Sequence, residues 1–114
     1  MERLIGHIIQ SITLDNHDRL VIITDKSKFI LTPEGDCCAY AYIHDYDQDA
    51  ARAICGHMVY KAHTYGFDSS DHDYGVIDTE FYSIQTHGGD LDIELRTEHN
   101  GYYGGWLDIS EIPL

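Results

Sequence analysis

Hydrophobic runs separated by polar stretches predict that the first third of the chain forms β-strands. Leu4 to Leu14 and Leu20 to Thr24 are rich in Ile, Leu, Val and Thr, and the polar stretch DNHDR separates them. Phe29 to Thr32 continues the pattern up to a turn at Pro33 to Asp36. β-branched residues bounded by turn residues are typical of strands.

The next strand is expected over Cys37 to His44, where side chains would alternate between two faces. One face would carry Cys37, Ala39, Ala41 and Ile43, and the other Cys38, Tyr40, Tyr42 and His44. The first set is small and apolar, so we expect it to pack closely against a helix. Cys37 is then most simply a core residue.

A short helix is predicted over Gln48 to Ile54, with Asp47 or Asp49 as its N-cap and Gly56 at its C-terminal end. Its residues Ala50, Ala53 and Ile54 are the expected partners of the small strand face. Met58 to His63 returns to a strand pattern, and Gly66 to Gly75 (GFDSSDHDYG) is expected to be a polar loop.

A hairpin is predicted around a two-residue turn at Gly88-Gly89. This turn would pair His87 with Asp90, Gln85 with Asp92 and Ser83 with Glu94 on a polar face. The opposite face would receive Tyr82, Ile84 and Thr86 against Leu91, Ile93 and Leu95. Register and polarity agree in this arrangement.

A second turn is expected in EHNGYYGGWLDI. A loop of three residues, or a bulge at Gly104-Gly105, would place Leu107 and Ile109 on the apolar face and turn Trp106 outward. The sequence therefore predicts one α+β domain over residues 1–114, a mainly antiparallel sheet protein of about six or seven strands with one short helix.

The formal charge of −13, from seven Lys and Arg against 20 Asp and Glu, argues against direct binding to nucleic acid or to an anionic membrane. A basic protein is the natural partner at long range. An acidic surface that only keeps the protein soluble is the plainer alternative. Without a membrane-spanning window or the features of a signal peptide, a cytoplasmic location is expected.

Catalytic and metal sites find little support in the sequence. A disulfide between adjacent Cys37 and Cys38 would be strained, and Cys38 and His44 are too far apart along a strand to share zinc. The calcium-like spacing of Asp71 and Asp73 lacks a closing glutamate. Cys38 could act as a nucleophile only if a histidine arrived from another strand. We expect no metal and no cofactor.

Two sequence motifs resemble a family of small, largely uncharacterised bacteriophage proteins. They are Gly35-Asp36-Cys37-Cys38 before an aromatic strand, and Asn100-Gly101-Tyr102-Tyr103-Gly104-Gly105 near the C-terminus. This chain has Ala39-Tyr40 where that family is expected to carry a serine and an acidic residue. The resemblance implies a phage gene that acts in the cytoplasm of an infected bacterium.

Four function hypotheses follow, and the last is a minor structural or assembly protein, which the sequence neither supports nor excludes. The first is a non-enzymatic counter-defence inhibitor, of the anti-CRISPR or DNA-mimic type, whose acidic rows occupy the basic nucleic-acid channel of a host defence protein. The second is a sponge for a nucleotide immune signal, in which aromatic residues stack on a base. The third is a cysteine-dependent enzyme through Cys38; a homo-oligomer is compatible with each. The acidic rows are Asp45, Asp47, Asp49 and Asp90, Asp92, Glu94, and the stacking set is Tyr40, Tyr42, His44, Tyr102, Tyr103 and Trp106.

Overall fold

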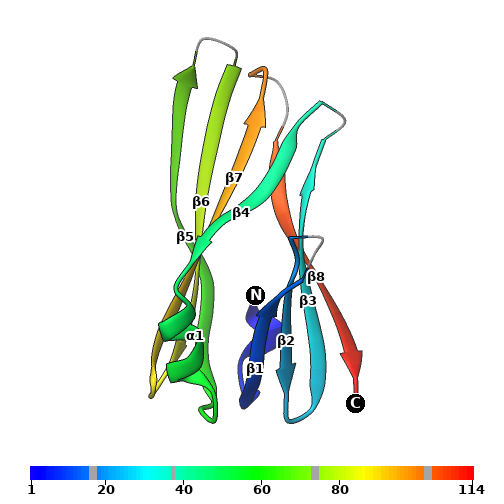
Figure 1. Cartoon of the computed structure of the whole chain (residues 1–114), viewed down its shortest axis with the longest axis vertical. Helices are drawn as coiled ribbons and strands as arrows, with labels where there is room; N and C mark the ends of the chain where they lie inside the picture. Colours follow the sequence, from blue (N-terminus) through cyan, green and yellow to red (C-terminus); the bar gives the residue numbers. More distant parts are fainter. Residues whose placement is uncertain (16–17, 37, 73–74, 102–103) are drawn as a thin grey trace.

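Two four-stranded antiparallel sheets form the molecule, whose principal extents are 44 × 24 × 22 Å (Figure 1). The computed structural model describes residues 1–15, 18–36, 38–72, 75–101 and 104–114, without the side chains of Asp45 and His72. One sheet has the order β1-β2-β3-β8 and the other β4-β7-β6-β5. The elements are η1 (Glu2–Leu4), β1 (Ile9–Leu14), β2 (Leu20–Thr24), β3 (Ser27–Gly35), β4 (Tyr40–Tyr46), α1 (Gln48–Ile54), β5 (Val59–His72), β6 (Gly75–Thr86), β7 (Gly89–His99) and β8 (Gly105–Pro113).

The α+β class with mainly antiparallel sheet and one short α-helix is confirmed. The described ranges contain eight strands, more than the six or seven expected from the sequence. No described helix is long and apolar enough to cross a membrane.

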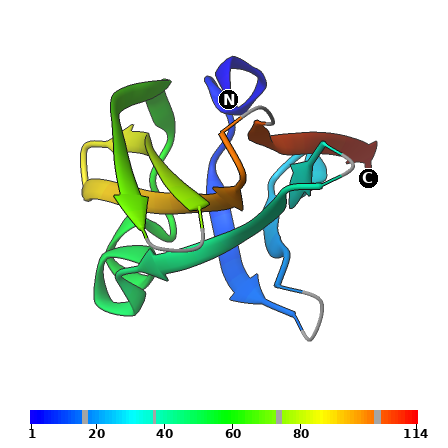
Figure 2. The same ribbon diagram turned by 90° about the horizontal axis from the view of Figure 1, so that it is seen from above.

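The core lies between the two sheets (Figure 2). Burial alternates along the strands as the sequence pattern requires, since every second side chain points to one face of a sheet. In β2, for example, Leu20, Ile22 and Thr24 are buried and the residues between them are half-buried. From the other sheet, Ile84, Leu91 and Ile93 meet this layer.

The hairpin of β6 and β7 has the predicted faces but a different register. Tyr82, Ile84 and Thr86 are buried together with Leu91, Ile93 and Leu95. The ladder pairs Gln85 with Asp90, Ser83 with Asp92 and Phe81 with Glu94, so the two turn residues are His87 and Gly88. The Thr86 hydroxyl fixes this turn, because it donates to the Gly89 carbonyl at 2.9 Å and accepts from the Gly88 N–H at 3.1 Å. The shift of two residues leaves the faces unchanged.

Helix α1 begins at the predicted cap and packs in a different place from the one expected. Asp47 Oδ1 accepts hydrogen bonds from the backbone N–H groups of Asp49 and Ala50 at 2.9 and 3.2 Å. The helix contacts β7 and β1, not the small face of β4, and Ala53 is exposed. Because α1 starts immediately after β4, it continues past the end of that strand and cannot fold back over it. Ala41 and Ile43 pack against the core instead, while Cys37 lies outside the described residues.

The segment expected to be a polar loop, Gly66 to Gly75, was wrongly assigned. Strand β5 runs on to His72 and pairs with β6 from Phe67 opposite Glu80 to His72 opposite Gly75. Residues 64–71 are all exposed, because this end of the hairpin extends beyond the core (Figure 1). Polar side chains are compatible with a strand whose two faces are both in water. Asp71 of the calcium-like spacing lies in β5, and Asp73 lies outside the described residues.

The last strand does not form a hairpin with its predecessor. β8 crosses to the other sheet and pairs with β3, from Gly35 opposite Gly105 to Ser27 opposite Pro113. The absence of a side chain at Gly105 permits this crossing, because a Cβ there would collide with the Thr97 side chain on β7. The predicted faces are confirmed: Leu107 is buried and Trp106 is 45% exposed.

Candidate functional site

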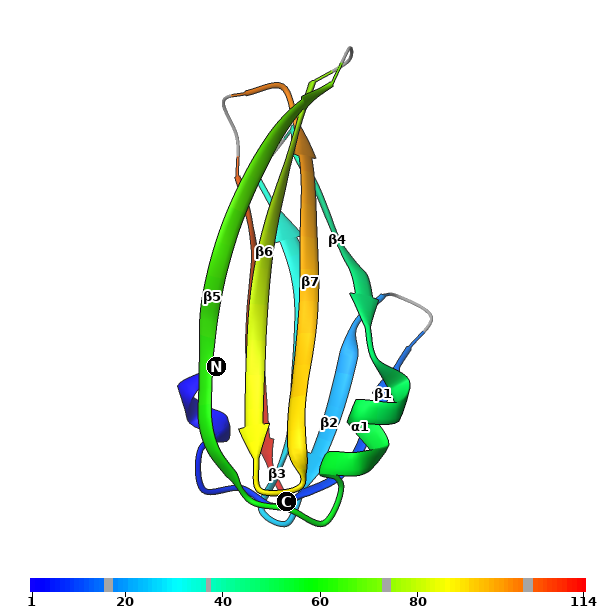
Figure 3. The ribbon, with the colours of Figure 1, turned by 90° about the vertical axis from the view of Figure 1, so that its left-hand side faces the viewer.

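Two of the predicted sets lie on neighbouring strands of one sheet. We call the surface of sheet β4-β7-β6-β5 that points away from the core the outer face; Figure 3 looks toward it. β7 places Asp90, Asp92 and Glu94 there, because the residues between them are buried. On β4, Tyr42 pairs with Arg96 of β7, so Tyr40 and Tyr42 share the same face.

Aromatic rings and charges form a continuous row along β4. The ring centroids of Tyr40 and Tyr42 are 5.3 Å apart, and those of Tyr42 and His44 are 6.4 Å apart. Glu94 Oε2 lies 3.7 Å from His44 Nε2 and accepts a hydrogen bond from Arg96 Nε at 2.8 Å. Burial raises the pKa of the Tyr42 hydroxyl, the nearby Glu98 adds to that rise, and Arg96 opposes it.

A second aromatic group lies on the other half of the outer face. Tyr65 of β5 and Phe81 of β6 are stacked with ring centroids 5.8 Å apart and an interplanar angle of 29°. Burial raises the pKa of the Tyr65 hydroxyl, and the Asp92 carboxylate, with which it shares a hydrogen bond, raises it further. His63 lies beside Tyr65, with a centroid distance of 6.0 Å.

Asp92 lines two adjacent concavities on this face. The larger, of about 320 Å³, is shared with His63, Tyr65, Ser83, Gln85 and Asp90. The smaller, of about 220 Å³, is lined by Asp92, Glu94, Asp47, Tyr46, Tyr65 and Phe81. Tyr65 and Phe81 were not among the residues predicted from the sequence. Phe81 could have been found, because the strand alternation of the hairpin puts it on the same face as Ser83 and Gln85. Tyr65 could not, because it lies between the predicted strand and the segment that was expected to be a loop.

The first acidic row is divided between different roles. Asp47 caps α1 and lines the smaller concavity. Asp49 lies on the helix, is 91% exposed at its side chain and pairs with Arg52 at 3.3 Å. The Asp45 side chain lies outside the described part of the structure. The turn from β4 into α1 ends the strand alternation on which this row was based.

The stacking set is divided between the two sheets. Trp106 lies on β8, where it pairs with Glu34 of β3, whereas Tyr40, Tyr42 and His44 lie on β4. Tyr102 and Tyr103 lie outside the described residues. The aromatic rings that the structure brings together with Tyr42 are those of Tyr40 and His44.

Cys38 lines a pocket of about 240 Å³ together with Glu98 and His99. The histidine is occupied at both ring nitrogens: Nε2 lies 2.7 Å from Asp78 Oδ2, and Nδ1 accepts from the Gly101 N–H at 2.9 Å. A general base needs a ring nitrogen directed at the thiol, whereas these two contacts direct the His99 nitrogens at Asp78 and Gly101. Among the described residues, no group of three or more His, Cys, Asp or Glu side chains is placed to hold a metal ion.

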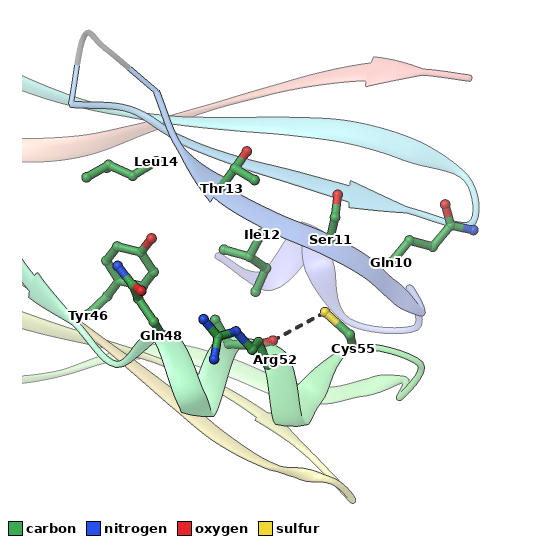
Figure 4. A pocket seen from close by; sticks show the side chains of 10 residues that line it. Gln10, Ser11, Ile12, Thr13, Leu14, Tyr46, Gln48, Arg52 and Cys55 are labelled. Atoms are coloured by element: carbon green, nitrogen blue, oxygen red, sulfur yellow. Dashed lines mark hydrogen bonds between the residues drawn. The ribbon is translucent and has the colours of Figure 1, made fainter.

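A further concavity, of about 430 Å³, lies between the edge strand β1 and helix α1 (Figure 4). Ile12, Leu14 and Tyr46 supply apolar surface, and Gln10, Gln48 and Arg52 lie at its border. The Cys55 thiol, at the C-terminal cap of α1, donates to the Ala51 carbonyl at 3.3 Å. This groove contains no residue of the two acidic rows or of the stacking set.

Comparison with known proteins identifies a family and a viral relative, and the description of neither one names an activity. The chain is 27% identical over 94 residues to "Uncharacterized protein L278" of Acanthamoeba polyphaga mimivirus, an alignment that covers 78% of this chain and 74% of the relative. No solved structure matches. Residues 2–109 match the model of a family described as "Domain of unknown function (DUF7448)". Because that match spans nearly the whole chain, the protein belongs to the DUF7448 family.

Proposed function

We propose that this chain is a non-enzymatic viral binding protein that blocks a host protein by covering its basic, nucleic-acid-binding surface with the outer face of sheet β4-β7-β6-β5. The observation that carries the proposal is the position of Asp90, Asp92 and Glu94 on one strand, between two groups of aromatic rings. Carboxylates steer a basic partner toward the face, and aromatic side chains supply contact area once it arrives.

Charge and ancestry support this assignment. A formal charge of −13 favours association with a basic surface over association with nucleic acid itself. The relative from a mimivirus supports a viral origin. A bacteriophage gene directed at a defence protein in the bacterial cytoplasm is the setting that we propose on the sequence motifs.

A nucleotide sponge receives less support from the same geometry. The stacking set is divided between two sheets, and the half on β4 lies beside Glu94 and Glu98, which would repel phosphate groups. Arg96, the arginine that the structure places at that position, is already engaged by Glu94 at 2.8 Å.

The proposal is tested by capture of host proteins from lysate on the immobilised chain at low and high salt, with a matched pair of variants. The first variant, D90N/D92N/E94Q, removes three negative charges from the outer face. The control, D18N/E34Q/D108N, removes the same number from exposed positions on the β1-β2 loop and on β3 and β8. Because the two variants have the same net charge, a difference between them in the captured host protein depends on where the carboxylates lie on the surface.

We expect a basic protein that is captured at low salt, released by high salt, retained by the control variant and lost by D90N/D92N/E94Q. Capture of the same protein by both variants with equal affinity would overturn the role of the outer face. Recovery of a nucleotide from the denatured chain, with no protein partner, would make the sponge the better description.

A further inference from the structure

The smaller concavity of the outer face has the composition of a receptor for a flat organic cation. Its lining combines the stacked rings of Tyr65 and Phe81 with the carboxylates of Asp47, Asp92 and Glu94. These groups come from separate elements, β5, β6, β7 and the start of α1, which the fold brings to one place. The concavity, of about 220 Å³, has room for the end of one long side chain.

We infer that this concavity binds the guanidinium group of an arginine side chain from the partner. A guanidinium is planar, so it stacks on an aromatic ring, and its N–H groups form paired hydrogen bonds with a carboxylate. Aromatic faces also attract cations directly, which makes rings and carboxylates cooperative here. A lysine ammonium can use the charge but gains less from the flat stack.

The carboxylates are already held in position from the side of the protein. Asp47 Oδ1 accepts the two helix N–H groups, Glu94 Oε2 accepts Arg96 Nε, and Asp92 shares a hydrogen bond with the Tyr65 hydroxyl. Each of these contacts fixes a side chain that would otherwise sample several rotamers. A receptor with fixed groups loses less conformational entropy when it binds.

Tyr65 and Phe81 lie where a partner can reach them. Tyr65 is 40% exposed and Phe81 is half-buried, so the stacked pair presents surface to water without support from a covering element. The inference rests on the proposed function, because the arginine would belong to the same basic partner. An arginine site restricts the class of partner to proteins that present arginine, and not lysine alone, on their nucleic-acid-binding surface.

Calorimetry with three synthetic Gly-Ser peptides tests the inference. The peptides are identical except that they carry arginine, lysine or citrulline at the same positions. We expect the arginine peptide to bind about two- to fivefold more tightly than the lysine peptide, as an exposed cation-π contact would give. The citrulline peptide, which is flat and neutral, should not bind measurably.

The variant Phe81→Leu removes the ring and keeps apolar volume, so it should abolish the preference for arginine and leave the lysine affinity nearly unchanged. Tyr60→Leu is the matched control, because Tyr60 is an exposed aromatic residue of the same strand as Tyr65 that contacts His87 outside the concavity. That control should keep the preference. Ring-proton shifts of Tyr65 and Phe81 during the titration localise the site, and a backbone amide spectrum confirms that each variant is folded.

Two failures are distinguishable. Equal affinity of the unaltered chain for the arginine and lysine peptides, or a preference for arginine that survives Phe81→Leu, would overturn the arginine site. The proposed function would still stand in that case if D90N/D92N/E94Q bound both peptides more weakly than the unaltered chain. Binding that is indifferent to D90N/D92N/E94Q, or no binding of either cationic peptide, would overturn both.

Discussion

Tyr82 carries a hydroxyl into the interface between the two sheets, where it is only 6% exposed. The hydroxyl donates to Glu80 Oε2 at 3.0 Å, and the backbone of Leu107, from the opposite sheet, also hydrogen-bonds to it. Burial and the Glu80 charge together raise the pKa of Tyr82 far above its usual range, more than the Leu107 contact lowers it. The folded state therefore holds this tyrosine neutral.

The first residue-scale prediction concerns alkaline pH. The pKa of Tyr82 is higher in the folded than in the unfolded chain, so its stabilising effect is complete below pH 10.0, the unfolded value, and is lost as pH rises above it. We expect the free energy of unfolding to fall above pH 10, and to fall less steeply in Tyr82→Phe. Urea denaturation between pH 8 and 11 measures both slopes. Tyr40→Phe, at an exposed position, is the control, and equal slopes in Tyr82→Phe and the unaltered chain would contradict the prediction.

The second residue-scale prediction concerns Asp78, which joins three strands. Its Oδ1 accepts from the Ser69 hydroxyl on β5 at 2.7 Å, and its Oδ2 lies 2.7 Å from His99 Nε2 on β7. The His99 side chain is only 6% exposed, so the loss of its partner leaves a nearly buried polar group. We expect Asp78→Ala to destabilise the chain by about 1–3 kcal/mol in urea denaturation.

Asp71→Ala, an exposed position on the same hairpin, is the control for Asp78→Ala and should change the free energy of unfolding by less than about 0.5 kcal/mol. An equal effect of the two substitutions would mean that the Asp78 network contributes nothing beyond surface charge.

At the scale of elements, the turn between β6 and β7 packs closely against the C-terminal end of helix α1. A Cβ at Gly88 would collide with the His57 ring and lie 2.8 Å from the Ala53 carbonyl oxygen. We expect Gly88→Ala to lower stability by about 1–3 kcal/mol, because backbone and a packed ring must both move. Gly104→Ala, whose Cβ would come no closer than 4.0 Å to Asp36 Oδ2, should be nearly neutral. Thermal denaturation of the two variants measures the difference.

The sequence predicted elements well where one face of a strand is buried. The alternation through Tyr82, Ile84 and Leu91 identified the β6-β7 faces, and the position of Asp47 identified the start of α1. It failed for Gly66 to Gly75, because that part of β5 is exposed on both faces and so carries no hydrophobic alternation. It also failed for the partner of β8, since the faces of Trp106 and Leu107 are the same whichever strand lies beside them.

Only part of the candidate site could be predicted from the sequence, again because local alternation is visible in a sequence and strand pairing is not. Asp90, Asp92 and Glu94 share a face through local alternation, which a sequence reveals. Their proximity to Tyr65 depends on the long β5-β6 ladder, which was hidden within the supposed loop. The separation of Trp106 from Tyr40 and Tyr42 depends on the assignment of β8 to the other sheet, which no local pattern specifies.

At the scale of the whole molecule, the charge of −13 must be accommodated on a chain of 114 residues. Repulsion among like charges destabilises the folded state, and salt screens it within a Debye length of about 10 Å at 0.1 M. We expect the melting temperature to rise between 10 and 200 mM sodium chloride, and to rise less in D90N/D92N/E94Q. A melting temperature that is independent of salt would show that the carboxylates are neutralised by local pairs such as Glu94 with Arg96.

The pairing of β3 with β8 joins residues 27–35 to residues 105–113, across most of the chain. Closure of so large a loop is entropically costly, and folding slows as contacts become more distant along the sequence. Until β8 arrives, β3 presents an unpaired edge that another chain could extend. The folding yield of this protein should therefore depend on concentration, because correct closure within one chain competes with strand exchange between two.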